Sequence, residues 1–502
     1  MDSVFSNLAL GFSAAGTPTN LALCFIGALV GTLIGVLPGL GPIATIAILL
    51  PITFSLDPLG ALIMLAGIYY GAQYGGSTTA ILVNMPGETS SVVTTLDGHQ
   101  MARQGRAGPA LAIAALGSFF AGSVATFLVA LFGPILASFA QNFGPPEYFA
   151  LMLTGLIGAI VLASGSVLKA VAMVIVGLLL GCVGSDIETG EQRLTFGIAQ
   201  IAEGINFTTL AVGLFGVAEI LRNLEKTQDR SILGAKITGL MPTWADIKQS
   251  IMPVLRGTGI GSVLGILPGN GAVLAPYASY TLEKKISRTP QRFGKGAIEG
   301  VAGPESANNA GAQTSFIPLL TLGIPPNAVM AMMVGAMTIQ GIVPGPTVMN
   351  ENPTLFWGMI ASMWIGNLML VIINLPLVGV WVRLLKVPYR ILFPAILMFC
   401  CIGVYSINSS GIEVMLVALF GAVGYFLVKH GFEPAPLLLA FVLGPLMEEN
   451  LRRSFLIARG DPMIFVNRPL SAFLLLVAVG LLILVLLPAI RKRREEVFHE
   501  EE

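Results

Sequence analysis

Residues 31–41 read GTLIGVLPGLG, and residues 261–271 read GSVLGILPGNG. The two stretches match at six positions with a constant spacing of 230 residues: Gly31 with Gly261, Gly35 with Gly265, Leu37 with Leu267, Pro38 with Pro268, Gly39 with Gly269, and Gly41 with Gly271. Proline removes a backbone donor and clashes with the preceding helical turn, and glycine tolerates positive φ. Because each stretch lies in an apolar run, each predicts a broken helix.

The composition places these breaks in a membrane protein. Of the 502 residues, 55% are hydrophobic and 11% are charged, whereas a typical soluble domain carries about 25% charged residues. The 27 basic residues balance the 27 acidic ones, which argues against a nucleic-acid-binding protein because such proteins carry a basic excess. The predicted fold class is an all-α polytopic membrane protein.

A helix needs about 20 apolar residues to cross the bilayer. The candidate spans are 20–37, 41–56, 59–74, 110–140, 146–165, 168–184, 198–221, 251–267, 326–342, 355–382, 389–405, 411–428, 432–447 and 470–490. Several of these segments are too short or too interrupted to cross alone. We therefore predict about 11 transmembrane helices together with re-entrant or broken helices, and whether 432–447 crosses or re-enters stays open.

The basic residues predict the orientation, since loops rich in Lys and Arg remain in the cytoplasm. Basic clusters lie at Arg103 and Arg106, in 222–248, in 284–295, in 383–390 and in 491–494. Three loops without Lys or Arg are expected outside: 142–147, 343–354 and 405–411. This places the N-terminus outside and the C-terminus in the cytoplasm. Residues 448–468 do not fit this orientation. They carry four arginines, yet a single span separates them from the basic tail, which would place them outside.

A second match follows the first in each half of the chain. Residues 71–87 read GAQYGGSTTAILVNMPG, and residues 311–326 read GAQTSFIPLLTLGIPP. By the orientation rule, the first copy starts outside and the second copy starts from a basic segment. The sequence therefore predicts two inverted repeats. The first half is 1–250 with motifs 31–41 and 71–88, and the second half is 251–502 with motifs 261–271 and 303–327.

Inverted repeats are typical of secondary transporters, whose substrate site lies near the bilayer midplane at the repeat interface. Unwound backbone is tolerated at that depth only where it is buried in protein or lines a water-filled cavity. The carbonyl groups of such backbone are free to bind a cation. The candidate coupling-ion residues, for Na⁺ at their carbonyls, are Gly39, Gly41, Gly269 and Gly271. The prolines of the predicted breaks are Pro38, Pro86, Pro268 and Pro325.

Hydroxyls and amides bind carboxylates without a fixed charge that would hold the substrate too tightly. The candidate substrate-binding residues are Gln73, Ser77, Thr78, Thr79, Asn84, Asn270, Asn308, Asn309, Gln313, Thr314 and Ser315. Two structural interpretations compete with this one. The polar residues can form interhelical hydrogen bonds, and the breaks can be kinks used for packing. The GxxxG series from Gly27 to Gly35 and from Gly257 to Gly265 favours close helix packing.

Three acidic residues lie near the repeated motifs: Glu88, Glu299 and Glu305. An ionisable residue inside the membrane is a functional hypothesis by default. For Glu88 and Glu299, a position in a polar loop at the membrane surface is the favoured alternative.

The motifs of enzymes and ATP-driven pumps are absent from the sequence. Gly294-Lys295-Gly296 lacks the remaining Walker A residues, and no HExxH or GxSxG occurs. The four cysteines form no CxxC pair, so we predict no metal site, no cofactor and no enzymatic activity. Transport would then run on an ion gradient, Na⁺ or H⁺, or on the ATPase of a partner.

Seven strings give the chain a family resemblance. They are GVLPGLGP at 35–42, YGGSTTAILVNMPGE at 74–88, DGHQMARQGRAGPAL at 97–111, GILPGNGA at 265–272, GPESANNA at 303–310, TLGIPPN at 321–327 and LGPLMEENLRRS at 443–454. With these strings the sequence resembles the large membrane subunit of the bacterial tripartite tricarboxylate transporters, the family that includes the citrate carrier. The resemblance covers nearly the whole chain.

The resemblance implies a multi-pass protein of the bacterial inner membrane with two partners. One partner is a small membrane subunit of about four helices, and the other is a periplasmic solute-binding protein that delivers the substrate. An ion gradient would drive uptake of a citrate-like di- or tricarboxylate. The individual carboxylate, the stoichiometry and the oligomeric state stay open, as does the choice between an elevator and a rocking mechanism.

Three other functions compete with a carrier. A channel would present rings of like residues from several subunits. An intramembrane enzyme would need a catalytic pair or a metal cluster, and none is visible in the sequence. A scaffold subunit without a translocation path would not need paired broken helices.

Overall fold

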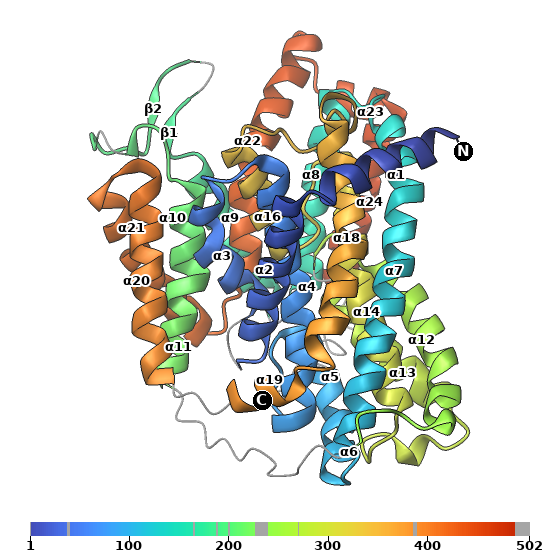
Figure 1. Ribbon diagram of the computed structural model, residues 1–502. Coiled ribbons are helices and arrows are strands. Elements are labelled where there is room, and N and C mark those ends of the chain that lie inside the picture. The colour runs from blue at the N-terminus through green and yellow to red at the C-terminus, as the bar shows by residue number, and fades with distance from the viewer. Residues whose placement is uncertain are drawn as a thin grey trace.

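The computed structural model describes residues 2–37, 41–163, 166–186, 189–198, 201–225, 239–269, 271–384 and 389–486. Within these residues the helices are joined by loops, and the strands form one two-stranded antiparallel ribbon (Figure 1). The elements up to residue 225 are α1 Asp2–Ala15, α2 Pro18–Gly35, α3 Pro42–Thr53, α4 Pro58–Val83, η1 Thr89–Ser91, α5 Val92–Thr94, η2 Thr95–His99, α6 Gln100–Arg103, α7 Ala107–Ala140, α8 Pro145–Leu162, α9 Val167–Gly181, β1 Gly184–Ser185, β2 Gln192–Arg193, α10 Phe207–Ala211, η4 Val212–Val217 and α11 Ala218–Glu225.

The elements that follow are α12 Trp244–Leu264, α13 Gly271–Ile286, η5 Pro290–Arg292, α14 Glu299–Thr314, α15 Phe316–Leu322, α16 Ala328–Ile339, α17 Val348–Glu351, α18 Pro353–Asn374, α19 Val378–Leu384, α20 Tyr389–Asn408, α21 Gly411–Lys429, α22 Pro434–Ile457, α23 Ile464–Asn467 and α24 Pro469–Leu486. The all-α membrane class is confirmed. In the described part of the chain, six helical segments are long and apolar enough to cross a membrane: 18–35, 107–140, 145–162, 207–225, 353–374 and 411–429.

The helices end at the Leu-Pro-Gly motifs, as the sequence predicts. In the first half α2 ends at Gly35 and α3 begins at Pro42. In the second half α12 ends at Leu264 and α13 begins at Gly271. The motif residues Pro38, Gly39 and Asn270 lie outside the described residues.

The polar segments behave differently from the broken motifs, because helix continues through them. Residues 71–83 extend α4 without interruption, and residues 308–314 belong to α14. The hydroxyl groups find acceptors in the preceding turn, since Ser77 Oγ lies 3.0 Å from the Gln73 carbonyl and Thr314 Oγ1 lies 3.1 Å from the Ala310 carbonyl. The first proline after the polar segment of α4 is Pro86, in the loop that follows the helix.

Two stripes of glycine bring the helices of each half into close contact, which confirms the packing interpretation of the GxxxG series. A Cβ built on Gly31 of α2 would lie 2.3 Å from the Ile68 carbonyl oxygen of α4. A Cβ built on Gly261 of α12 would lie 2.2 Å from the Ala307 carbonyl oxygen of α14. Only a residue without a side chain permits this approach. The helix with the Leu-Pro-Gly break is thus packed against the polar helix in both halves.

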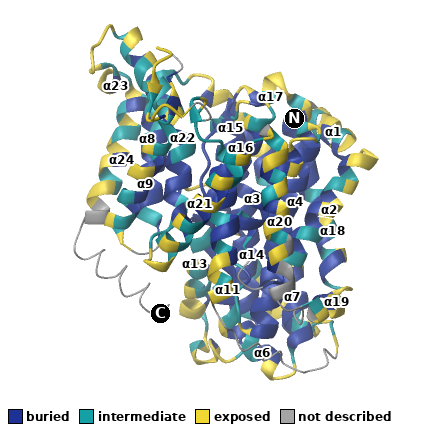
Figure 2. Ribbon diagram, turned by 90° about the vertical axis from the view of Figure 1, so that its left-hand side faces the viewer, coloured by how far each residue is buried: buried dark blue, intermediate teal, exposed yellow. Residues whose placement is uncertain are grey.

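The two polar helices form the centre of the molecule. Every residue from Leu59 to Val83 in α4 and from Gly300 to Thr314 in α14 is buried. Figure 2 shows buried residues concentrated in the middle of the bundle and exposed residues on the outer helices and loops. The long helix α7 packs against α14, where Ala121 and Ala125 contact Ala310. This burial removes the polar side chains of α4 and α14 from the lipid.

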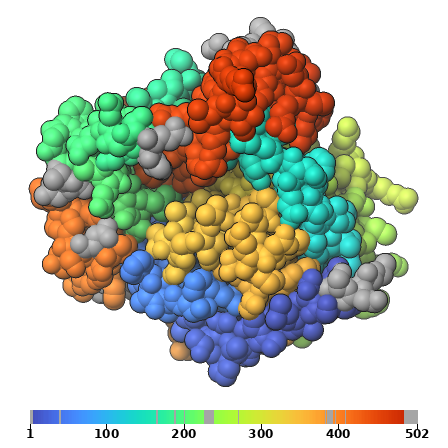
Figure 3. Space-filling model, turned by 90° about the horizontal axis from the view of Figure 1, so that it is seen from above, coloured from blue at the N-terminus to red at the C-terminus, as the bar shows by residue number. Residues whose placement is uncertain are grey.

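The two ends of the bundle differ in the elements that they carry. Figure 1 places α6, α11 and α19 at one end, and α1, α23 and the β1–β2 ribbon at the other. Seen from the latter end, the segment around α16 to α18 lies between the N-terminal and the C-terminal helices (Figure 3). Arg103, Arg222 and Arg383 belong to the first set of elements, so we call it the basic end.

The four arginines of 448–468 lie in the last turns of α22 and in the connection through α23 to α24, away from the basic end. Three of them pair with acidic side chains: Arg452 with Asp186 and Glu448, Arg453 with Glu449, and Arg468 with Glu147. This pairing gives these arginines a local structural role.

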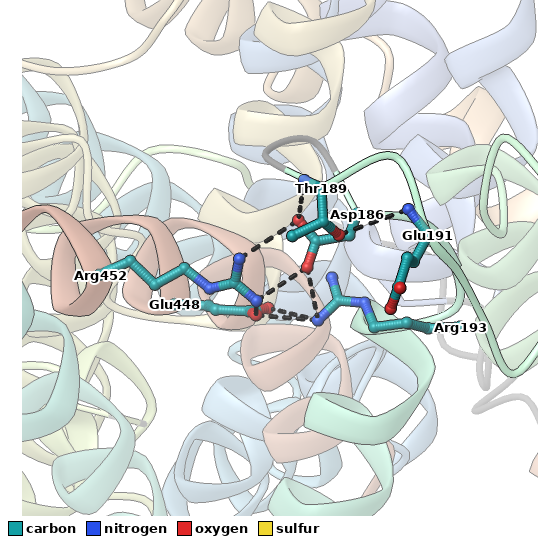
Figure 4. A network of polar contacts seen from close by, with 6 residues as sticks. All are labelled: Asp186, Thr189, Glu191, Arg193, Glu448 and Arg452. Atoms are coloured by element: carbon teal, nitrogen blue, oxygen red, sulfur yellow. Dashed lines mark hydrogen bonds and ion pairs between the residues drawn. The ribbon is translucent and has the colours of Figure 1, made fainter.

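Arg452 belongs to a network of polar contacts that joins the β1–β2 ribbon to α22 (Figure 4). Arg452 donates to Asp186 at 2.8 Å and to Glu448 at 2.7 Å. Arg193 of β2 donates to Glu448 at 2.8 Å and lies 3.7 Å from Asp186. Asp186 is only 6% exposed, and burial makes the loss of a charged partner costly.

We expect Asp186→Asn to loosen the ribbon, because the amide removes the charge that both arginines face. Trypsin cleavage after Arg193 should accelerate at least about fivefold, which corresponds to about 1 kcal/mol of lost local stability. Gel analysis of the purified protein in detergent measures the rate. Glu449→Gln is the matched control on α22, since it breaks only the exposed pair with Arg453. Equal cleavage rates in the two variants would show that the network does not hold the ribbon.

Candidate functional site

The buried carboxylate of Glu305 joins the two polar helices. Glu305 lies on α14 and is 1% exposed. Ser77 Oγ of α4 donates to Glu305 Oε2 at 2.5 Å, and Thr94 Oγ1 of α5 donates to Oε1. The contact links motif 71–88 of the first half to motif 303–327 of the second.

A second carboxylate lies beside the first. Glu88, which follows α4, is half-buried. Its Oε1 accepts from Ser90 Oγ at 2.7 Å and from Asn308 Nδ2 of α14 at 3.1 Å. The Gln73 amide of α4 also faces Glu88, and its NH₂ group points toward that carboxylate because its oxygen would otherwise meet only acceptors. We call these residues the carboxylate cluster: Gln73, Ser77, Glu88, Ser90, Thr94, Glu305 and Asn308.

Helix geometry explains why these side chains meet. Gln73 and Ser77 are four residues apart on α4, and Glu305 and Asn308 are three residues apart on α14. Both spacings place side chains on one helix face. The glycine contact between α2 and α4, and that between α12 and α14, occupy other faces of the two helices. The polar faces can therefore turn toward each other and toward residues 88–94.

The carboxylate cluster contains two acidic side chains and no basic one. The described partners of both carboxylates are neutral hydroxyl and amide groups. None of the ion pairs among the described residues includes Glu88 or Glu305. A buried carboxylate without a charged partner is costly, and a second one nearby raises the cost. A proton or a monovalent cation would relieve it.

Four other predicted substrate-binding residues do not belong to the carboxylate cluster. Asn309 Nδ2 donates to Ser118 Oγ of α7 at 2.7 Å. Thr78 Oγ1 donates to the Tyr74 carbonyl at 3.3 Å. Gln313 is buried, and its Oε1 has no partner among the described residues. Asn84 is exposed at the C-terminus of α4, where its φ of 60° is left-handed.

Two predicted residues stabilise the helix ends at the breaks. Thr79 Oγ1 of α4 lies 3.4 Å from the Gly35 carbonyl and 2.9 Å from the Val36 carbonyl. Ser315 Oγ lies 3.2 Å from the Gly265 carbonyl. Carbonyls at a helix end lack intrahelical partners, so the hydroxyls provide them. In both halves, therefore, a hydroxyl group lies close to the carbonyl of the equivalent glycine, Gly35 or Gly265.

The glycines proposed to bind the coupling ion lie at the breaks. Gly41 precedes α3, and its carbonyl accepts from Thr45 N at 3.2 Å and from Thr45 Oγ1 at 3.0 Å. Gly269 has a φ of 105°, which favours glycine, and its N–H donates to the Pro326 carbonyl at 2.7 Å. Gly271 starts α13. Gly39 lies outside the described residues.

The described prolines of the breaks take different positions. Pro268 packs against Gly158 of α8, where a Cβ would lie 3.1 Å from the proline ring. Pro86 lies between α4 and η1, and Pro325 lies between α15 and α16. Each of the three therefore lies between two helices.

A comparison with protein families identifies the chain. The model described as "Tripartite tricarboxylate transporter TctA family" matches residues 21–439. The chain belongs to this family. The match confirms the resemblance found in the sequence, and it supports a membrane transport role with further components. It includes both copies of each repeated motif and every residue of the carboxylate cluster.

Two proteins of Agrobacterium vitis are similar to this chain. The "Uncharacterized 52.8 kDa protein in TAR-I ttuC' 3'region" is 61% identical over 502 residues, which is the full length of both chains. The "Uncharacterized protein in TAR-II ttuC' 3'region" is 61% identical over 242 residues, which is 48% of this chain and all of that protein. No solved structure matches the chain.

Sequence reasoning missed three residues of the site. Ser90 and Thr94 lie in the polar run ETSSVVTT at 88–95, directly after the motif that was recognised. This run of hydroxyl residues could have indicated that the site continues beyond Glu88. Ser118 lies in an apolar stretch of α7 with no such signal, and only its contact with Asn309 reveals it. A polar loop was the favoured position for both Glu88 and Glu299. Glu88 lies in the loop between α4 and η1, where it joins the carboxylate cluster, whereas Glu299 is the first residue of α14 and pairs with Arg292.

Proposed function

We propose that the chain is the translocating subunit of a three-component secondary transporter. It would take up a citrate-like di- or tricarboxylate across the bacterial inner membrane, driven by an ion gradient and dependent on a periplasmic binding protein. The observation that carries this proposal is the direct contact between the two polar motifs, through Ser77 with Glu305 and Asn308 with Glu88. A midplane site at the interface of two repeats is the arrangement that secondary transporters use.

The proposed architecture consists of two inverted repeats, 1–250 and 251–502, with about 11 crossings. Two features support the repeats. Gly31 and Gly261 make equivalent close contacts, and Thr79 and Ser315 bond equivalent carbonyls. The N-terminus would lie outside and the C-terminus in the cytoplasm, which makes the basic end cytoplasmic.

The carboxylate cluster is our candidate for the coupling group. Its two carboxylates lack a described countercharge, so a proton or Na⁺ arriving down its gradient would bind there favourably. If the ion is Na⁺, the carbonyls of Gly41, Gly269 and Gly271 in the breaks would be its further oxygen ligands, and the Gly41 carbonyl would have to give up its bond from Thr45 Oγ1. The polar residues of α4 and α14 would bind the substrate carboxylates beside this cation.

The family implies a transporter with further components, and we propose that these are a small membrane subunit and a binding protein. A small membrane subunit would cover part of the apolar surface, and α21 offers such a surface because Met415, Leu419 and Phe426 are exposed. The binding protein would approach the end that carries α1 and α23. We propose a transport function and no enzymatic one, because the matching family is a transporter family.

Uptake of labelled citrate into proteoliposomes tests this proposal. The vesicles contain the chain and its small membrane partner, with an inward Na⁺ gradient or an inward proton gradient, each with and without the binding protein. We expect accumulation that needs one of the gradients and the binding protein. Accumulation without the binding protein would remove the binding-protein dependence. Downhill flux that never concentrates citrate would favour a channel.

A further inference from the structure

Asp97 is a buried carboxylate that joins the first half of the chain to the start of α14. It lies on η2 and is 0% exposed. Its Oδ1 accepts from the backbone N–H groups of Gly296 at 2.7 Å and Ala297 at 2.8 Å, and its Oδ2 accepts from the Tyr280 hydroxyl at 2.9 Å. All three donors are uncharged and belong to the second half. Asp97 therefore connects the string 97–111, which begins with it, to the segment that leads into α14.

The backbone at the start of α14 leaves room for this carboxylate. A Cβ built on Gly300, in the first turn of α14, would lie 2.3 Å from Asp97 Oδ2, so only glycine permits the approach. The N-terminal end of a helix carries a partial positive charge, which makes a carboxylate favourable there. Figure 1 shows α6, which follows η2, and α13, which carries Tyr280, toward the basic end. Asp97 thus contacts α14 at its N-terminus, on the basic side of the bundle.

The same segment of the first half also reaches Glu305. Thr94, three residues before Asp97, donates to Glu305 Oε1. Glu305 lies six residues after Glu299, where α14 begins, which is about 9 Å along the helix axis. Residues 94–97 therefore hold α14 at two separate points, and two points fix both the axial position and the rotation of a helix. These two quantities decide whether Glu305 can accept from Thr94 and from Ser77 of α4 at the same time.

We propose that Asp97 is a positioning residue for Glu305, and that it sets the affinity of Glu305 for the coupling ion by fixing α14. The inference rests on the proposed function and extends it to the string 97–111, outside the carboxylate cluster. Without the Asp97 carboxylate, the N–H groups of Gly296 and Ala297 lose their acceptor, and the start of α14 is free to shift. Glu305 then loses its bond from Thr94, and the ion loses a preorganised ligand. Removal of a group that orients an ion's ligand typically weakens ion binding about 10- to 100-fold.

Ion-dependent thermal stability tests this role without relying on transport. The melting temperature of the purified protein in detergent is measured over a range of Na⁺ concentrations and over a range of pH, because an ion that binds the folded state stabilises it. The part of the stabilisation that Glu305→Gln abolishes reports the ion at Glu305. For Asp97→Ala, we expect the Na⁺ or proton concentration at which this part sets in to rise at least about tenfold. A purely structural role would lower the melting temperature at every ion concentration and leave this onset unchanged.

Three further variants make the test specific. In Asp97→Asn, the side-chain oxygen can accept from both backbone N–H groups and the NH₂ group can donate to the Tyr280 oxygen, so the onset should return to within about twofold of the parent. Gln104→Ala is the matched control, because it removes only an exposed bond to the Lys295 carbonyl at the same interface, and its onset should equal that of the parent. Tyr280→Phe removes one of the three donors. It replaces Asp97→Ala if that variant does not fold, and it should raise the onset at least about twofold.

A parental onset in Asp97→Ala, or in Tyr280→Phe where it is the replacement, overturns the inference and leaves Glu305 as the coupling group. An equal rise in Gln104→Ala also overturns it, because any loss of contact between the two loops would then have the same effect. If the parent shows no stabilisation that Glu305→Gln abolishes, Glu305 holds no ion, and the inference fails together with the coupling assignment. Uptake of labelled citrate by the parent then shows whether the proposed transport function stands.

Discussion

Glu305→Gln is expected to reduce gradient-driven accumulation of substrate to less than about a tenth of the parental level, because the amide cannot bind the proton or cation that the carboxylate would hold. Glutamine has nearly the same shape. Its oxygen can accept from one of the two hydroxyls, Ser77 or Thr94, and its NH₂ group can donate to the other, so folding should persist. Exchange of labelled for unlabelled substrate needs no net ion movement and should survive. Uptake and exchange in proteoliposomes, with size-exclusion chromatography as the folding check, measure both effects.

Glu299→Gln is the matched control for this experiment. Glu299 lies on the same helix, but it is 19% exposed and pairs with Arg292 at 2.5 Å. Exposed ion pairs contribute little, so uptake should stay within about twofold of the parent. If Glu305→Gln accumulates substrate like the parent, the coupling group is elsewhere. A loss of exchange together with accumulation would assign Glu305 to substrate binding.

Gly261→Ala is expected to destabilise the protein strongly. The added methyl group would lie 2.2 Å from the Ala307 carbonyl oxygen and 2.9 Å from the Ala307 carbonyl carbon, so α12 and α14 must separate. Overpacking of a buried contact costs about 1–3 kcal/mol, and here the obstacle is backbone, which cannot rotate away. The apparent melting temperature in detergent should fall by several degrees, as measured by thermal unfolding of the purified protein.

Gly259→Ala provides the control, since it makes the same substitution on the same helix where no atom lies within 4 Å of the added methyl group. Alanine has the better helix propensity, so this variant should be as stable as the parent or slightly more stable. Gly31→Ala in the first half should repeat the effect of Gly261→Ala, because its methyl group would lie 2.3 Å from the Ile68 carbonyl oxygen. Equal stability of all three variants would contradict the role assigned to the glycine stripes.

Sequence patterns predicted the local features of the fold well because local chemistry determines them. Low charge and long apolar runs indicated a helical membrane protein, and the prolines and glycines at 31–41 and 261–271 indicated where helices end. The GxxxG series indicated close packing. The polar segment of α4 was harder to interpret, because its hydroxyls can bond the preceding turn and its polarity does not by itself break a helix.

The candidate site was predictable only in part. The polar motifs contained Gln73, Ser77 and Asn308, which meet in the carboxylate cluster, and also Asn84, which is an exposed helix cap. The sequence held no signal to separate a cluster residue from a helix cap, because Gln73, Ser77 and Asn84 are all polar residues of motif 71–88. What separates them is the helix face on which each residue lies and the partner that this face meets.

By itself, the sequence determined the membrane class, the family and the positions of the helix breaks, since apolar runs and proline-glycine motifs act over a few residues. Only the tertiary structure decided that Ser77 meets Glu305 across 228 residues of chain, and that Ser118 of α7 reaches Asn309. Such contacts depend on how far each helix is rotated and how closely it approaches its neighbour. Glycine contacts and packed side chains from distant segments set both quantities together.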